Sequence, residues 1–384
     1  MRPYRKVGLT VKVRIHKLFE YLLETTDAAP ECILGFSLST SPRLSDFLAD
    51  LDPDLALDWN GRSFLGLPEL REKVIVQAGL GGTCSPDAVL ITAGAAEANY
   101  LALRQLLSPG DQIVTEMPGW PQAGVLARAI GADLRLVQRY EENGWRLNPD
   151  DLAKAVTPKT KLIFLSNPNN PTGALMSGDD LRAVAAIADK VGAWLLVDEV
   201  YAGLEWDGPR PPSIAGLYPR GITTGSVSKA LGLQGLRTGW MICQDPVMIR
   251  DAVILRENSS EIMNILGEHI AEIALRPARL MSAIAEARAA ALPLLAQLDS
   301  FIALQPRLSW VKPQAGLIGL ARLDGIAAEP LARRLLNAPY RTFVLPGTAY
   351  DHPNHIRLGV GGGAAVRLTE GLARLQRCLA DTPI

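Results

Sequence analysis

A single lysine, Lys229, stands in a stretch of small and hydroxylated residues, SVSKALGLQGLRTGW, over positions 226–240. A lysine among small residues can lie in a buried pocket, where desolvation lowers its pKa and leaves the amine nucleophilic. Ser226, Ser228 and Arg237 offer the hydroxyl groups and planar guanidinium that suit a phosphate. Taken alone, Lys229 is better explained as a solvated surface residue, so its interpretation depends on the rest of the chain.

Two further motifs suit the same chemistry. Gly94, Ala95 and Ala96 stand at the start of an expected helix, where free backbone N–H groups and the helix dipole favour phosphate. The sequence NPNNPTG over residues 167–173 follows an apolar run and forms a rigid turn that presents the amide of Asn170. Taken singly, the first is often only a helix cap and the second only a turn.

An acidic residue ends the most apolar run of the chain. Asp198 follows Trp-Leu-Leu-Val, and Tyr201 comes three residues later. A carboxylate at a buried position is costly unless it pairs with a cation or a protonated ring nitrogen. The alternative is that Asp198 caps the segment that follows.

Short apolar strands alternate with helical segments from about residue 88 to residue 243. This pattern predicts an α/β fold with a mostly parallel sheet that helices cover on both faces. Ligands of such sheets collect beyond the carboxyl ends of the strands, where these motifs fall. The expected strands are Val89–Thr92, Gln112–Glu116, Asp133–Val137, Lys161–Ser166, Ala193–Asp198, Gly221–Gly225 and Thr238–Cys243.

A smaller α+β unit is expected after the long helical region of residues 247–292. We expect residues 1–50 to form an N-terminal arm and part of the small domain, 51–275 the large cofactor-binding domain, and 276–384 the small C-terminal domain. The expected elements of the last part are strands at Phe301–Leu304, Leu317–Leu320, Thr342–Leu345 and His355–Leu358 and a helix at Arg367–Ala380.

Composition narrows the function classes. The chain has 384 residues and a net charge of −1, which gives no electrostatic case for nucleic acid or an anionic membrane. Four scattered cysteines suit a reducing compartment, and the four histidines show no metal-binding spacing, so no metal is expected. No apolar run of membrane-spanning length and no signal peptide are found, so we expect a soluble, cytoplasmic protein.

The order and spacing of these motifs resemble the class I/II aminotransferases, which are fold-type I pyridoxal-phosphate (PLP) enzymes. The resemblance runs from about residue 60 to residue 365, and its most specific motif is SVSKALGLQGLRTGW, followed by NPNNPTG and VDEVY. It implies a large domain with a mostly parallel sheet and a smaller α+β domain. It also implies a homodimer whose substrates are small molecules, an α-amino acid and a 2-oxo acid, with PLP as cofactor.

The resemblance also implies a role for each site residue. Lys229 would form the Schiff base and move the proton, and Asp198 would pair with the ring nitrogen. Tyr201 and Asn170 would hold the ring hydroxyl, and Trp120 would stack on the ring. The implied phosphate ligands are Ala95, Ala96, Ser226, Ser228 and Arg237, and the implied substrate-binding residues are Gly35, Asn170 and Arg357.

Three departures from the family pattern bear on the reaction. Ala95 and Ala96 lack the hydroxyl that the family often has, and Gly61 stands where a tyrosine usually reaches the partner subunit's phosphate, with Trp59 and Phe64 nearby. Glycines follow Arg357 where serine or phenylalanine is more usual. In these respects the chain resembles capreomycidine-synthase-like enzymes.

We therefore expect transamination between an α-amino acid and a 2-oxo acid. A PLP-dependent lyase, cyclase or oxidase of natural-product biosynthesis is the first alternative, and a non-catalytic effector-binding domain is the second. Arg62 could pair with a distal substrate carboxylate, although a lone loop arginine is more often solvated.

Overall fold

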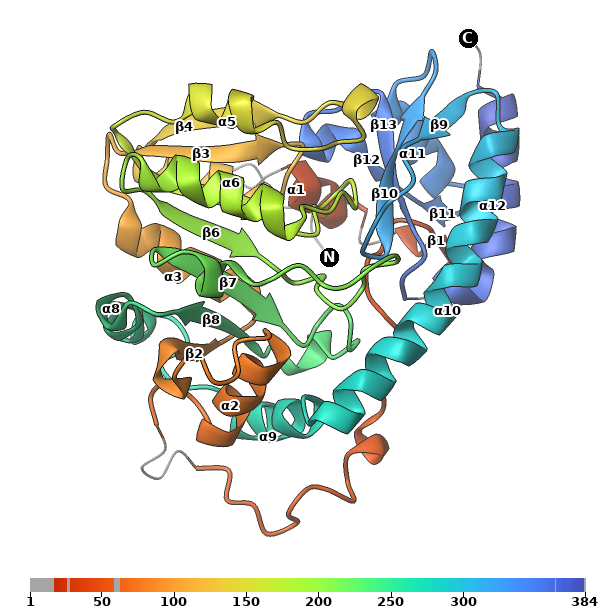
Figure 1. Ribbon diagram of the computed structural model, residues 1–384. Helices are drawn as coiled ribbons and strands as arrows, with labels where there is room; N and C mark the ends of the chain where they lie inside the picture. The colour runs from red at the N-terminus through yellow and green to blue at the C-terminus, as the bar shows by residue number, and fades with distance from the viewer. Residues whose placement is uncertain (1–16, 26–27, 59–62, 363, 383–384) are drawn as a thin grey trace, which may run out of the picture.

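The larger domain is built on a seven-stranded sheet, seen in the computed structural model of Figure 1, which describes residues 17–25, 28–58, 63–362 and 364–382. In spatial order the strands are β2 (Val89–Thr92), β8 (Gly239–Cys243), β7 (Gly221–Ser226), β6 (Trp194–Asp198), β5 (Thr160–Ser166), β3 (Gln112–Met117) and β4 (Asp133–Gln138). Strands β3 to β7 pair in parallel, and β8 runs antiparallel to both of its neighbours. The predicted mostly parallel sheet is confirmed.

Helices cover both faces of this sheet because its central strands are apolar on both sides. Phe164 of β5 packs in one core and the neighbouring Ile163 packs in another, on the opposite face. The first core includes α3 (Ala95–Leu106), α4 (Gln122–Ile130) and α8 (Pro246–Arg256), and the second includes α5 (Pro149–Ala155), α6 (Gly178–Asp189) and α7 (Ile214–Leu217). Helices α2 (Pro68–Gln77) and α9 (Ile265–Ala274) pack against each other beside β2.

The helix α10 (Pro277–Leu304) leads from the large domain to the small domain (Figure 1). By length and composition it is the one described helix that could cross a membrane. Its buried residues Ala291, Leu295, Leu298 and Ile302 follow one helix face into the core of the small domain. The expected strand at Phe301–Leu304 is therefore wrong: these residues are the last turn of α10, and a short apolar run does not distinguish a strand from a buried helix.

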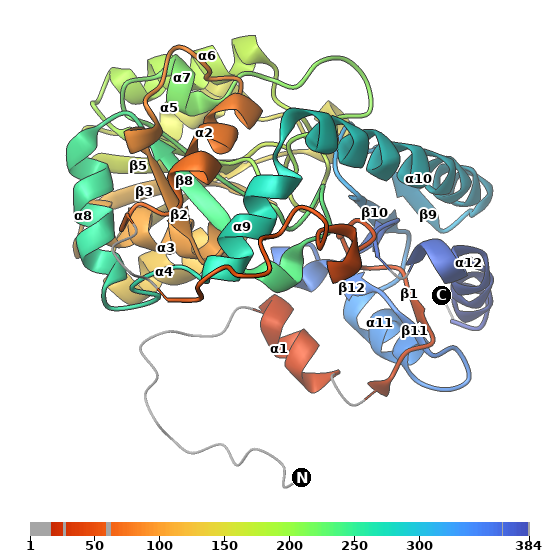
Figure 2. The ribbon, with the colours of Figure 1, turned by 90° about the horizontal axis from the view of Figure 1, so that it is seen from below.

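The small domain combines an antiparallel sheet with helices and the N-terminal segment (Figure 2). The sheet has the order β12 (Leu345–Pro346), β13 (His355–Gly359), β10 (Ile318–Leu323) and β9 (Leu308–Trp310), and a parallel pair joins β1 (Cys32–Ile33) to β11 (Thr342–Phe343). Its helices are α1 (Lys17–Glu24), α11 (Ala328–Leu336) and α12 (Ala364–Ala380). Leu18, Tyr21 and Leu34 share its core, which supports our proposal that residues 1–50 form an N-terminal arm and part of the small domain, although Phe47 packs in the core beside β2 in the large domain.

Candidate active site

A cavity of about 290 Å³ lies beyond the carboxyl ends of β5, β6 and β7. Ten predicted site residues line it: Ala95, Ala96, Trp120, Asn170, Asp198, Tyr201, Ser226, Ser228, Lys229 and Arg237. A second cavity, of about 210 Å³, adjoins the first, with Trp120, Asn170 and Lys229 in both, and contains Arg357. The fold thus brings the predicted residues to one place, although they come from segments spread over most of the chain.

Lys229 follows β7 and points its amine into the cavity. Its Nζ lies 3.4 Å from the Ser37 hydroxyl and 5.6 Å from the centre of the Tyr201 ring. Burial lowers the pKa of Lys229 to about 8, and the nearby Arg357 acts in the same direction, against the attraction of Asp198. About a tenth of the amine is therefore neutral and nucleophilic at pH 7, far more than for an ordinary lysine.

Asp198, at the end of β6, is 5% exposed and has neutral hydrogen-bond partners. Asn99 of α3 donates to its Oδ2 at 2.8 Å, and the backbone N–H of Val200 donates to its Oδ1 at 3.1 Å. Burial raises the pKa of Asp198 to about 6. A buried carboxylate without an ion-pair partner among the described residues is the group that a protonated ring nitrogen would stabilise.

Tyr201 lies beside Lys229, with its ring 1% exposed. Its hydroxyl donates to Ser37 at 2.9 Å, and burial raises its pKa. Ser37 therefore contacts both Tyr201 and Lys229. These contacts fix the phenol at the cavity wall as a neutral hydrogen-bond donor.

The other end of the cavity has the chemistry of a phosphate site. The N-terminus of the 12-residue α3 begins at Ala95, and Gly94 has a φ of +84° before it. A Cβ on Gly94 would lie 2.6 Å from Nη2 of Arg237, which bonds the Ala93 carbonyl at 3.2 Å. Helix N–H groups, the guanidinium and the Ser226 hydroxyl, which lines the same cavity, suit a phosphate dianion.

Arg357 of β13 is 7% exposed, and its hydrogen bonds go to neutral oxygens. Nη1 donates to the Tyr350 hydroxyl at 2.7 Å and to Asn170 Oδ1 at 3.2 Å, and Nη2 donates to the Gly35 carbonyl at 2.6 Å. Its Nε has no hydrogen-bond partner within the described part of the chain, and no carboxylate there forms an ion pair with it. A buried cation with these neutral partners has the charge and geometry that suit a carboxylate.

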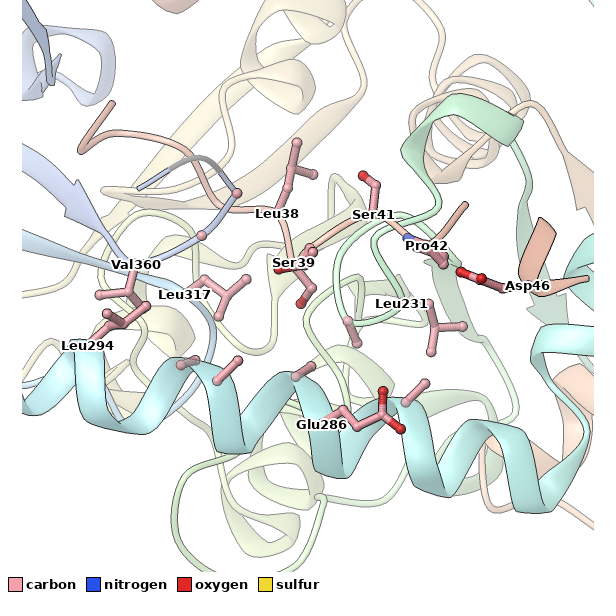
Figure 3. Close-up of a pocket in the computed structure, with 18 of the residues that line it drawn as sticks. Leu38, Ser39, Ser41, Pro42, Asp46, Leu231, Glu286, Leu294, Leu317 and Val360 are labelled. Atoms are coloured by element: carbon pink, nitrogen blue, oxygen red, sulfur yellow. The ribbon is translucent and has the colours of Figure 1, made fainter. Parts of the chain in front are cut away.

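Another cavity, of about 510 Å³, lies between residues 38–43 and α10 (Figure 3). Its carboxylates are those of Asp46 and Glu286, both exposed, and the described residues that line it include no predicted site residue. Leu38 is the residue that it shares with the cavity around Lys229. Because the buried, pKa-shifted groups are elsewhere, we assign the chemistry to the cavity that contains Lys229.

Comparison with known proteins identifies the family. The model for "Aminotransferase class I and II" matches residues 62–375. The chain belongs to this family. Arginine–pyruvate transaminase AruH of Pseudomonas aeruginosa is 30% identical over 323 residues, which cover 78% of this chain and 77% of that protein.

Solved structures agree with this assignment. A PLP-dependent aminotransferase from Streptococcus suis has a TM-score of 0.87 and 26% identity, with 97% of this chain and 100% of that chain covered. A PLP-dependent cyclase, OrfR, has a TM-score of 0.85 and 26% identity, with 99% of each chain covered. The fold is that of the fold-type I PLP enzymes, and PLP is the cofactor that membership of the aminotransferase family implies.

Sequence reasoning missed three residues of this aminotransferase-family site. Asn99 holds Asp198, Ser37 contacts Lys229, and Tyr350 holds Arg357. None stands in a recognisable motif, although Ser37 lies two residues after Gly35. Trp59, Gly61 and Arg62, to which the predictions gave special roles, lie outside the described residues.

Proposed function

We propose that this aminotransferase-family enzyme transfers an amino group from an α-amino acid to a 2-oxo acid. The observation that carries the proposal is the placement of the Lys229 amine in one cavity with the Asp198 carboxylate and in the adjoining cavity with Arg357. A nucleophilic amine, a buried carboxylate and a guanidinium without a carboxylate partner among the described residues are the groups that an amino-acid reaction with PLP requires.

Each residue has a separate task in this proposal. PLP, when bound, supplies an aldehyde and an electron-withdrawing ring. Lys229 would hold the aldehyde of the cofactor through its neutral amine, and the same amine would accept and return the proton at the substrate Cα. Asp198 keeps a proton on the ring nitrogen, and Tyr201 donates to the ring hydroxyl. Arg357 binds the α-carboxylate with its fork, which orients the Cα–H bond.

We propose that the enzyme works as a homodimer in the cytoplasm. Leu44, Leu48 and Leu57 expose 55%, 58% and 70% of their surface on a segment that runs below α2 and α9 (Figure 1). Exposed leucines of this kind are expected to be covered by a partner. The cysteines at positions 32, 84, 243 and 378 are all free, which suits a reducing compartment. Sedimentation at micromolar concentration tests the dimer, and an active monomer would contradict it.

The similarity to the cyclase OrfR supports a second candidate reaction, PLP-dependent cyclisation or elimination. We propose to incubate the holoenzyme with single amino acids and pyruvate or 2-oxoglutarate, and to detect products by mass. Transamination predicts a new oxo acid and a new amino acid in equal amounts, both lost in Lys229→Ala. Ammonia or a cyclised product without amino-group transfer would establish the second reaction instead.

A further inference from the structure

We propose that the substrate of this enzyme has a bulky, apolar side chain, like that of leucine or phenylalanine. The inference rests on the proposed reaction and names the substrate class. Its basis is the cavity of about 210 Å³ that adjoins the cofactor cavity. We call it the side-chain pocket, and define it by Leu18, Leu22, Phe36, Leu38, Phe343 and Leu345.

Two polar contacts fix where the substrate side chain must lie. In the proposed reaction the α-carboxylate binds Arg357, because its guanidinium can donate two parallel hydrogen bonds. The Cα–H bond must face Lys229, because its amine is the base that accepts the proton. Both residues line the side-chain pocket. A substrate held at these two points has its remaining substituent against the rest of that lining.

The rest of the lining is apolar, apart from Ser37 and Asn170. Both polar groups already have partners: the Ser37 hydroxyl accepts from Tyr201, and Asn170 Oδ1 accepts from Tyr350 and Arg357. An apolar group that enters this space loses contact with water and meets carbon atoms, which is favourable in proportion to its area.

One side of the pocket is a close-packed aromatic and aliphatic wall. The ring of Phe343 is 5% exposed and meets the ring of Phe36, which is 37% exposed, edge to face with centroids 5.5 Å apart. A Cβ on Gly35 would lie 2.9 Å from Phe343 Cε1, so the backbone approaches this ring closely. Leu345, beside it, is 1% exposed. The buried carbon surfaces of Phe343 and Leu345 limit the size of the apolar group that can enter.

Charged substrate side chains find no complement among the described residues that line the two cavities. The cations are Lys229, Arg357 and Arg237, and Arg237 lies at the phosphate end. The one carboxylate is Asp198, which accepts from Asn99 and the Val200 N–H. A distal carboxylate or guanidinium would lose its hydration without an ion pair. The substrate class therefore differs from that in the name of the arginine–pyruvate transaminase.

The test compares kcat/KM of the holoenzyme for leucine, phenylalanine, alanine, aspartate and arginine. We expect leucine and phenylalanine to exceed alanine by roughly tenfold to a hundredfold, because each extra buried carbon contributes several-fold. Aspartate and arginine should fall below alanine. If alanine reacts but leucine and phenylalanine do not exceed it, the side-chain inference fails while transamination stands. If no amino acid transfers its amino group, the proposed function fails.

A matched pair of variants on α1 locates the pocket. Leu22 lines it, whereas the adjacent Leu23 is 63% exposed and does not. Leu22→Arg should lower kcat/KM for leucine at least tenfold relative to alanine and raise the aspartate-to-leucine ratio, and Leu23→Arg should change neither. Alanine turnover serves as the folding reference in both variants. Equal ratios in Leu22→Arg and Leu23→Arg would overturn the assignment of this pocket.

Discussion

The buried carboxylate of Asp198 makes the stability of the cofactor-free protein depend on pH in a way that one substitution removes. Its pKa is about 6 in the folded chain and about 3.9 when the chain is unfolded. The folded state therefore binds this proton more tightly, so the stabilisation is present at low pH and is lost as the pH rises through 6. Between pH 5 and pH 8 the loss is on the order of 1 kcal/mol of unfolding free energy.

The substitution Asp198→Asn removes the titrating group and keeps the side chain nearly the same size. Its altered hydrogen bonds to Asn99 and Val200 change stability equally at both pH values, so the pH-dependent difference isolates the carboxyl group. A change from pH 5 to pH 8 should lower the unfolding free energy of the wild-type apoprotein by about 1 kcal/mol more than that of the variant.

Urea unfolding of both apoproteins at the two pH values, followed by tryptophan fluorescence, measures this difference. Asp189→Asn, at an exposed position at the end of α6, is the control and should leave the pH dependence unchanged. Parallel behaviour of wild type and Asp198→Asn would refute the claim that this carboxylate is desolvated. With PLP bound, the ring nitrogen offers the missing cation, so the penalty at pH 8 should shrink.

Three other substitutions address the remaining parts of the site. Arg357→Lys keeps the positive charge but loses the bidentate geometry of the guanidinium, so we expect KM for the amino acid to rise roughly 10- to 100-fold in steady-state kinetics. An unchanged KM would exclude a role of Arg357 in binding the substrate carboxylate. Tyr350→Phe removes the 2.7 Å hydrogen bond to Arg357 and should raise KM several-fold with kcat nearly constant, whereas a fall in kcat alone would contradict a positioning role. Gly94→Ala places a Cβ 2.6 Å from Arg237 at a φ of +84° and should weaken PLP binding about tenfold in a fluorescence titration. Unchanged binding would show that Gly94 and Arg237 are not part of the phosphate site.

The sheet could be predicted from the sequence because its strands are short, apolar and separated by helices. Asp198 is the last residue of β6, and Lys229 lies three residues beyond the end of β7, so both are near the edge where the carboxyl ends of these parallel strands meet. Their position at this edge could be predicted from the strand pattern, whereas their roles were implied by the resemblance to the aminotransferases.

The partners of these residues could not be predicted, because tertiary packing alone brings them into contact. Asn99 is an ordinary polar residue on a helix, 99 positions before Asp198, and Ser37 is 192 positions from Lys229. Tyr350 belongs to a short 3-10 helix that carries no motif. The side-chain pocket could not be predicted from the sequence either, because the residues that line it come from α1, the segment after β1 and the strands β11 and β12.

The three acceptors of Arg357 come from three separate parts of the chain: Gly35 in the N-terminal segment, Asn170 in the large domain and Tyr350 in the small domain. The side chain that we propose as the carboxylate receptor thus also links the two domains. A carboxylate that binds Arg357 competes with these three oxygens for the same N–H groups. The affinity for the carboxylate and the stability of the interdomain contact are therefore thermodynamically coupled. A change that weakens the interdomain hydrogen bonds of Arg357 in the ligand-free enzyme should therefore raise the affinity for the carboxylate. A change that strengthens these hydrogen bonds should lower that affinity.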